Sequence, residues 1–210
     1  MSQLKEGILN TNRQGDKAFV PYIMAGDGGL ETLKPTILKL QQLGVTAIEV
    51  GIPFTDPVAD GPTIEKAGER ALAKGTTLRK VIETLHTFAD EVTVPLVAMT
   101  YLNPILAYGV EEFSRDAKNA GIRGVIIPDM PLEERGIVHP TLKSHGIDLV
   151  QLVSLTSTPE RIEKLTKASE GFIYAVTVNG ITGARSSFEG DLESHFKKIQ
   201  NYTDTPVLAG

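Results

Sequence analysis

The chain has 210 residues, of which 41% are hydrophobic and 22% are charged, as is typical of a soluble globular protein. Its net charge of −5, without a cluster of basic residues, argues against nucleic acid as the main partner. The sequence has no cysteine, which excludes disulfides, thiolate catalysis and zinc–cysteine sites. No apolar run approaches the roughly 20 residues of a membrane span. The first residues lack the apolar stretch of a signal peptide, so we expect a cytoplasmic protein.

Short apolar segments alternate with longer amphipathic ones along the chain. The apolar segments are residues 19–26, 47–53, 95–101, 124–129, 148–154, 171–178 and 206–210. Such short, nearly unbroken apolar runs predict parallel strands that are covered on both faces. Helical spacing marks the segments between them, as in residues 30–40, where Pro35 should kink the helix or delay its start.

Glycines end several of the predicted helices just before the next strand. Each suits the left-handed position that follows a helix: Gly44, Gly75, Gly121 and Gly146. No linker or low-complexity stretch interrupts the alternation. We therefore expect residues 1–210 to form one domain.

The alternation allows either an open doubly wound sheet or a (β/α)₈ TIM barrel. The loop after the first strand, AGDGGLE, has no GxGxxG, which gives a dinucleotide crevice little support. Nearly every predicted strand ends in a polar or turn-forming residue, and in a barrel these ends surround one mouth. The sequence therefore predicts an α/β TIM barrel. Because such barrels have about 250 residues, we expect seven strands here, with the region of the eighth missing from the chain.

The segment AIEVGIPFTDPVADGP, residues 47–62, places a carboxylate inside an apolar strand. Strand alternation puts Glu49 on the face opposite Ile48 and Val50. Because a carboxylate against the helix layer is costly without a partner, Glu49 is expected to point into the barrel. Burial there would raise its pKa and suit it to proton transfer. A structural glutamate in an ion pair explains the position almost as well.

Two further carboxylates, Asp56 and Asp60, follow in the loop after this strand. Asp60 precedes Gly61-Pro62, which fits a turn and then the start of a helix, so a capping role competes with a catalytic one. Asp56 fits a turn or a surface position. The residue types alone do not decide among these roles.

Five motifs, in order along the whole chain, are similar to the signature of the tryptophan synthase α subunit family. They are FVPYIMAGD, EVGIPFTDPVADGP, MTYLNPILAYG, GVIIPDMPLEE and YAVTVNGITGAR. The resemblance implies cleavage of indole-3-glycerol phosphate to indole and glyceraldehyde 3-phosphate, a retro-aldol reaction without a cofactor. It also implies a pyridoxal-phosphate β subunit as partner, which joins the indole to serine.

The resemblance assigns roles to the residues of this chain. Glu49 would perform the acid–base work, and Asp60 would accept a hydrogen bond from the indole N–H as positive charge develops. Tyr22 would line the indole pocket, where the family often has phenylalanine. Tyr174 would reach Glu49 or the substrate. The spacing alone is equally consistent with Tyr22 as a core aromatic residue and Tyr174 as an ordinary strand residue.

Residues 179–190 resemble the family's sixth loop, a lid that excludes water, although a surface loop fits the same residues. Thr182 matches the threonine that bonds Asp60 when this loop closes. Gly183 would donate a backbone N–H to the phosphate, whose other ligands we expect beyond Gly210, so we expect weak phosphate binding. Thr177-Val178 departs from a family serine–arginine pair.

The resemblance also implies a surface for the β subunit in an α₂β₂ complex. The positions that it assigns to this surface are Phe54, Asp56, Pro57, Asn103 and Pro104.

Two other functions remain possible from the sequence. The first is another sugar-phosphate aldolase or isomerase on the same barrel, although no predicted strand contains the lysine that a Schiff-base aldolase needs. The second is a non-catalytic protein that binds and activates the β subunit. Indole release with and without the β subunit separates these alternatives.

Overall fold

The computed structural model describes residues 2–177 and 192–210. Parallel strands form one sheet in the order β1-β2-β3-β4-β5-β6-β7. They are β1 (Tyr22–Met24), β2 (Ile48–Gly51), β3 (Leu96–Met99), β4 (Ile122–Ile126), β5 (Asp148–Val153), β6 (Ile173–Ala175) and β7 (Val207–Ala209). A doubly wound sheet would reverse this order at a switch point. The order therefore confirms the barrel arrangement, with β1 and β7 as the two edges of the part described.

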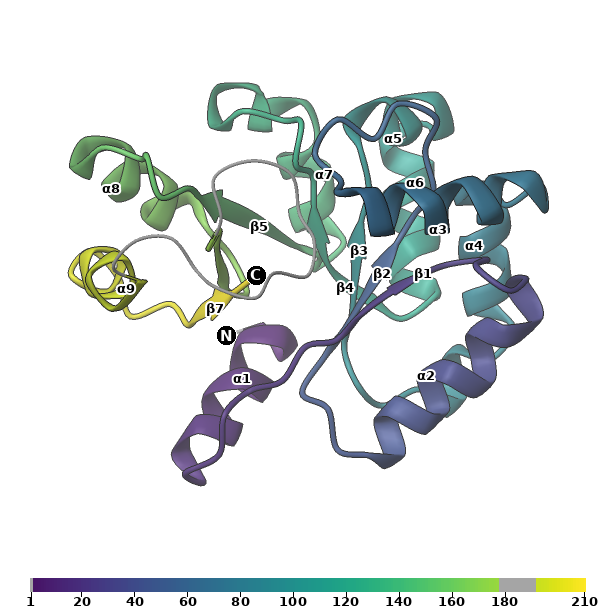
Figure 1. Cartoon of the computed structure of the whole chain (residues 1–210), viewed down its shortest axis with the longest axis horizontal. Coiled ribbons are helices and arrows are strands. Elements are labelled where there is room, and N and C mark those ends of the chain that lie inside the picture. Colours follow the sequence, from purple (N-terminus) through teal and green to yellow (C-terminus); the bar gives the residue numbers. More distant parts are fainter. Residues whose placement is uncertain (1, 178–191) are drawn as a thin grey trace.

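Helices cover the outside of the curved sheet. They are α2 (Leu33–Gln42), α3 (Pro62–Ala73), α4 (Leu78–His86), α5 (Leu102–Tyr108), α6 (Val110–Asn119), α7 (His139–Ser144), α8 (Pro159–Ala168) and α9 (Leu192–Gln200), with the 3₁₀ helices η1 (Leu30–Thr32), η2 (Ala89–Glu91) and η3 (Leu132–Ile137). In Figure 1, α2–α6 lie beside β1–β4, and α8 and α9 lie beside β5–β7.

The two faces of the sheet bury different residues of the same strand. Ile48 and Val50 of β2 belong to the large apolar cluster under the outer helices. Ala47 belongs to a second cluster on the inner face, with Val97 and Val150. Glu49 is thereby directed inward, as the alternation predicts.

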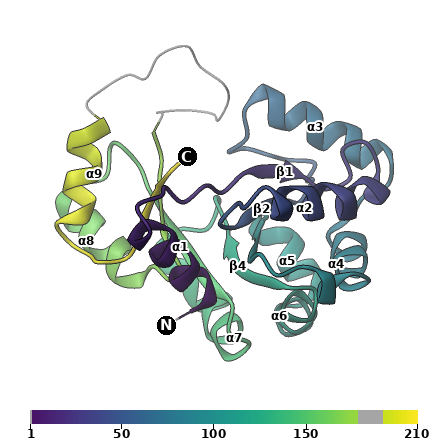
Figure 2. The same ribbon diagram turned by 90° about the horizontal axis from the view of Figure 1, so that it is seen from below.

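Another helix, α1 (Gln3–Arg13), packs on the inner cluster instead of the outer layer. Figure 2 shows it between the group α2–α6 and the pair α8 and α9. Leu4 is 1% exposed and packs so closely that a Cβ added at Gly124 or Gly171 would lie 2.9 or 2.8 Å from its methyl group. Small residues at these two positions therefore make room for Leu4.

Several local predictions hold. The glycines predicted to follow helices have left-handed φ angles of 79°, 74°, 87° and 71° at Gly44, Gly75, Gly121 and Gly146. Pro35 lies in the first turn of α2, where its missing N–H costs no helical hydrogen bond. The helix starts after a 3₁₀ turn over residues 30–32, so the predicted delay is confirmed.

Candidate active site

A cavity of about 340 Å³ opens between the first two strands and the last two. Tyr22, Glu49 and Tyr174 line it together with Leu208 and Gly210. Tyr22 and Glu49 are register partners on β1 and β2, and Tyr174 and Leu208 are register partners on β6 and β7. The fold thus brings predicted site residues from both ends of the chain to one cavity.

Glu49 is the buried carboxyl group of this cavity. Its side chain is 7% exposed, and burial raises its pKa from 4.5 to about 7. Within residues 2–177 and 192–210, no cationic side chain forms an ion pair with it. The structure therefore gives no support to the alternative of an ion-paired structural glutamate.

Two tyrosines stand beside Glu49, and glycines leave room for both. Burial is the main cause that raises the pKa of Tyr174 to about 12, and the charge of Glu49 adds to it. Burial also raises the pKa of Tyr22 well above its usual value, with further contributions from Asp60 and Glu49. A Cβ at Gly51 would lie 1.9 Å from the Tyr22 hydroxyl, and one at Gly210 would lie 2.3 Å from that of Tyr174. Neither position therefore accepts a side chain without displacing a tyrosine.

Asp60 lies in the loop between β2 and α3. The sequence also allowed Asp60 to cap a helix, but the N-cap of α3 is Gly61. Burial raises the pKa of Asp60, a hydrogen bond from Tyr101 lowers it, and the charge of Glu65 raises it. Asp60 does not line the cavity that holds Glu49, but its charge, like that of Glu49, raises the pKa of Tyr22.

Tyr101 is bonded to the loop that carries Asp60, a contact that the sequence did not reveal. Its side chain is 4% exposed, and its oxygen accepts a hydrogen bond from the N–H of Ala59 at 3.0 Å. The only sequence signal was its place directly after a predicted strand, where polar residues were expected.

The positions expected to face a partner lie at the carboxyl end of the sheet. Phe54, Asp56 and Pro57 are in the loop before α3, and Asn103 and Pro104 are in α5. The Phe54 ring lies 5.2 Å from that of Tyr101, between centroids. The loop before α3 is therefore in contact with the residue that precedes α5.

Thr182, Gly183 and the predicted lid, residues 179–190, fall outside the described residues. Thr177, which precedes them, is described. Its backbone N–H and its hydroxyl both donate to the carbonyl oxygen of Gly210, at 2.9 and 3.1 Å. Thr177 thus ties the segment after β6 to Gly210, which follows β7 and lines the cavity.

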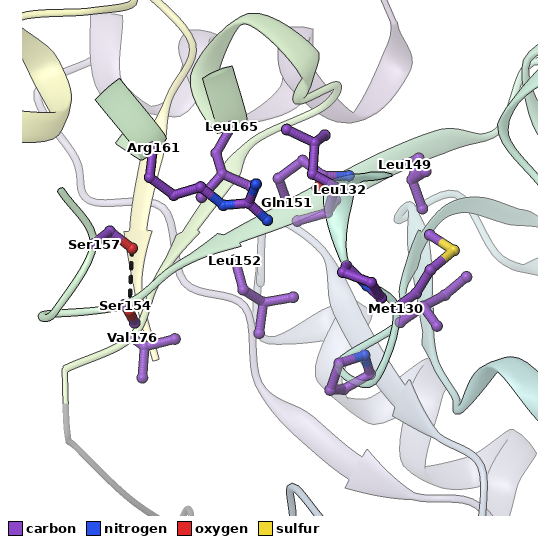
Figure 3. A pocket seen from close by; sticks show the side chains of 14 residues that line it. Met130, Leu132, Leu149, Gln151, Leu152, Ser154, Ser157, Arg161, Leu165 and Val176 are labelled. Atoms are coloured by element: carbon purple, nitrogen blue, oxygen red, sulfur yellow. Dashed lines mark hydrogen bonds between the residues drawn. The ribbon is translucent and has the colours of Figure 1, made fainter. Parts of the chain in front are cut away.

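A second cavity, of about 220 Å³, lies between β5, η3 and α8 (Figure 3). Gln151, Leu132 and Leu165 contribute to its wall, and the Ser154 and Ser157 hydroxyls are 3.1 Å apart beside it. Neither Glu49 nor any other predicted site residue lines this cavity. Of these two cavities, the first is therefore the one that contains a carboxyl group suited to proton transfer.

Within the described parts of the chain, no group of three or more histidine, aspartate or glutamate side chains is placed to hold a metal ion. No helix in those parts is both long and apolar enough to span a membrane.

Residues 8–210 match the family model of the tryptophan synthase alpha chain. The chain belongs to this family. It is 51% identical to the tryptophan synthase alpha chain of Bacillus cereus over 205 residues, which are 98% of this chain and 80% of that protein. Its structure is similar to that of Mycobacterium tuberculosis tryptophan synthase, with a TM-score of 0.90, 33% identity, and coverage of 100% of this chain and 80% of the other. It is also similar to that of tryptophan synthase subunit alpha from Legionella pneumophila, with a TM-score of 0.88 and 30% identity. That match covers 100% of this chain and 78% of the other.

Family membership fixes the reaction. The chain is a carbon–carbon lyase that cleaves indole-3-glycerol phosphate to indole and glyceraldehyde 3-phosphate, in a complex with a β subunit that makes tryptophan. The two alternatives left open by the sequence, another sugar-phosphate enzyme and a non-catalytic partner, are thereby set aside.

Proposed function

We propose that Glu49 carries the protons in the cleavage of indole-3-glycerol phosphate and that Asp60 stabilises the charge that forms on the indole. The observation that carries the proposal is the raised pKa of Glu49, about 7, in a cavity shared with Tyr22 and Tyr174. Near neutral pH both forms of Glu49 are populated, so one carboxyl group serves as acid and as base.

In this proposal Glu49 alone donates and accepts the protons that the cleavage moves. Its protonated form gives a proton to carbon C3 of the indole, which leaves positive charge on the ring nitrogen. The resulting carboxylate takes the proton of the glycerol hydroxyl next to the ring. The bond between C3 and the glycerol carbon then breaks, the hydroxyl carbon becomes the aldehyde, and the bonding electrons restore the aromatic indole.

Asp60 acts where the positive charge appears. As a carboxylate it accepts a hydrogen bond from the indole N–H, and a fixed negative charge at this point favours the transition state over the substrate. Tyr22 and Tyr174 would form the walls of the indole pocket. The roles of Thr182 on Asp60 and of Gly183 on the phosphate remain part of the proposal.

We further propose that the cleavage uses no cofactor and that the pyridoxal phosphate belongs to the β subunit. The C3-protonated indole ring accepts the electrons of the breaking bond, and Glu49 transfers the protons, so the step needs no cofactor as an electron sink. A cytoplasmic location is also proposed, in line with the bacterial relatives of the chain.

Replacing Glu49 tests the catalytic assignment. Glu49→Gln keeps the size of the side chain but cannot transfer a proton, so indole release should fall by about 10²–10⁴-fold. Asp148→Asn is the matched control, because Asp148 is another strand carboxylate that is 8% exposed with a pKa raised by burial, but it does not line the cavity. Both variants are assayed with the β subunit and checked by circular dichroism. Near-normal indole release by a folded Glu49→Gln protein would refute the assignment.

A further inference from the structure

We propose that the second cavity, between β5, η3 and α8, binds a molecule of indole through the side-chain amide of Gln151. The cavity has a volume of about 220 Å³. A dry cavity of about 150 Å³ accepts benzene, and indole has half as many non-hydrogen atoms again. The site is separate from the cavity that holds Glu49, so it does not depend on the catalytic role proposed for that residue.

The cavity lies where β4 and β5 separate. The described register between these strands pairs residues 124–126 with residues 148–150. From Gln151 onward β5 pairs with β6, on its other side. Four successive residues of β5, 149–152, line the cavity. Because neighbouring residues of a strand point to opposite faces, a cavity that touches all four lies at the edge of the strand. The separation of the two strands therefore creates the space.

Gln151 is a buried polar side chain in the wall of this cavity, and it is 5% exposed. It points to the helix side of β5, because Leu149 belongs to the cluster under the outer helices and Val153 packs with Leu165 of α8. Figure 3 shows Gln151 on the same side of β5 as Leu165. Its backbone N–H donates to the Ser169 hydroxyl at 3.3 Å, but its side-chain amide forms no hydrogen bond within the described parts of the chain. A buried amide without a partner is unfavourable, so we expect a bound molecule to supply one.

Water is a poor occupant of this cavity. Most of the lining side chains are apolar, as Leu132 and Leu165 are. The Ser154 hydroxyl, which also lines the cavity, is already hydrogen-bonded to those of Thr156 and Ser157, each at 3.1 Å. Because a buried water needs about two to four polar partners, an apolar molecule with one hydrogen-bonding group fits these walls better.

The charges of the wall favour an uncharged occupant. Among the described residues that line the cavity, Arg161 alone is charged, and its guanidinium donates to both carboxylate oxygens of Glu133. This ion pair leaves little positive charge for a phosphate. Of the molecules of the cleavage, indole-3-glycerol phosphate and glyceraldehyde 3-phosphate carry a phosphate, whereas indole is neutral. The amide oxygen of Gln151 can accept the indole N–H, and the leucines can contact its rings.

The methionine methyl groups allow the two cavities to be observed separately. Met130 lines the second cavity, whereas the Met24 sulfur accepts the Tyr22 hydroxyl at 4.0 Å beside the first. Indole is titrated into the full chain with isotope-labelled methionine methyl groups, and their resonances are followed by NMR. The Met130 resonance should shift and saturate, and inorganic phosphate should leave it unmoved. No shift of Met130 up to the solubility limit of indole, or an equal shift with phosphate, would overturn the proposal.

Gln151→Leu tests the contact itself, because it removes the amide and keeps a side chain of similar size. Loss of one hydrogen bond predicts indole binding about 3- to 10-fold weaker at Met130, with the Met24 titration unchanged. Thermal unfolding shows that the variant is folded, as expected when an apolar group replaces an unpaired buried amide. N-methylindole, which has no N–H to donate, should bind both proteins equally at Met130. Equal affinity of both proteins for indole would overturn the proposal.

Gln200→Leu is the matched control. Gln200 is an exposed residue at the end of α9, and it lines neither of the two cavities. This variant also loses a glutamine amide, but both methionine titrations should remain as in the wild type. If Gln200→Leu weakened the binding of indole at Met130 as much as Gln151→Leu does, the effect would not come from the cavity, and the proposal would be wrong.

Discussion

At the scale of single residues, the inward direction of Glu49 could be predicted because it depends only on the two-residue period of a strand. Its pKa could be predicted in direction, since burial of a carboxylate always opposes its charge. Tyr101 could not be predicted in the same way. Its hydrogen bond from the Ala59 N–H depends on how the loop after β2 folds back on β3, and no periodic pattern encodes that path.

The raised pKa of Glu49 has a consequence for stability. Below pH 4.5 the carboxyl group is protonated in both the folded and the unfolded states, so its burial costs nothing extra. Between pH 4.5 and about 7, Glu49 ionises in the unfolded state but not in the folded state, so the free energy of unfolding falls.

The Glu49→Gln variant lacks this titration. Its stability relative to wild type should therefore increase by about 3 kcal/mol from pH 4.5 to pH 8. Urea unfolding of both proteins at several pH values measures this difference. A difference independent of pH would mean that Glu49 titrates normally.

At the scale of elements, most strands were predicted from their apolar runs, whereas α1 was missed. Only Leu4 and Ile8 of this helix are fully buried, and Gly7 lies between them, so its sequence has little helical signal. The helix forms because the inner face of the sheet offers Leu4 the space above Gly124 and Gly171. Tertiary packing therefore decides its structure, which a reading of local pattern cannot detect.

The packing of α1 predicts a large effect of a small change. Leu4→Ala removes a side chain that is 1% exposed inside the inner cluster, and it should lower the free energy of unfolding by about 2–5 kcal/mol. Leu9→Ala, in the same helix but only partly buried, should cost much less. Denaturant unfolding of both variants measures the two losses. Equal losses would indicate that α1 contributes helix formation but no specific packing.

At the scale of the whole molecule, the strand order followed from the alternation of strands and helices, and polar residues at the strand ends indicated which end carries the site. The cavity could not be placed in detail, because it needs β1 and β2 to approach β6 and β7 at a definite distance. Glu49 and Tyr174 are 125 positions apart by number, and only the curvature of the sheet brings them to one wall. Such long-range geometry has no local signal in the sequence.

The position of the site at the carboxyl end of the strands also predicts where the β subunit binds. Val58 is 76% exposed in the loop that also carries Phe54 and Asp60, at the carboxyl end of the sheet. Leu43 is 67% exposed at the end of α2, which leads into β2 and so lies at the opposite end. An exposed apolar residue next to the site is a natural contact for a partner.

Val58→Asp should therefore weaken binding of the β subunit by about tenfold or more, because burying a charge without a partner is unfavourable. Leu43→Asp introduces the same charge at the other end and should leave the dissociation constant unchanged. Titration calorimetry with the β subunit measures both constants, and thermal unfolding shows whether each variant is folded. If Leu43→Asp weakened binding as much as Val58→Asp, the partner would not be confined to the end of the barrel that holds Glu49. In that case the expected interface around Phe54, Asn103 and Pro104 would be wrong.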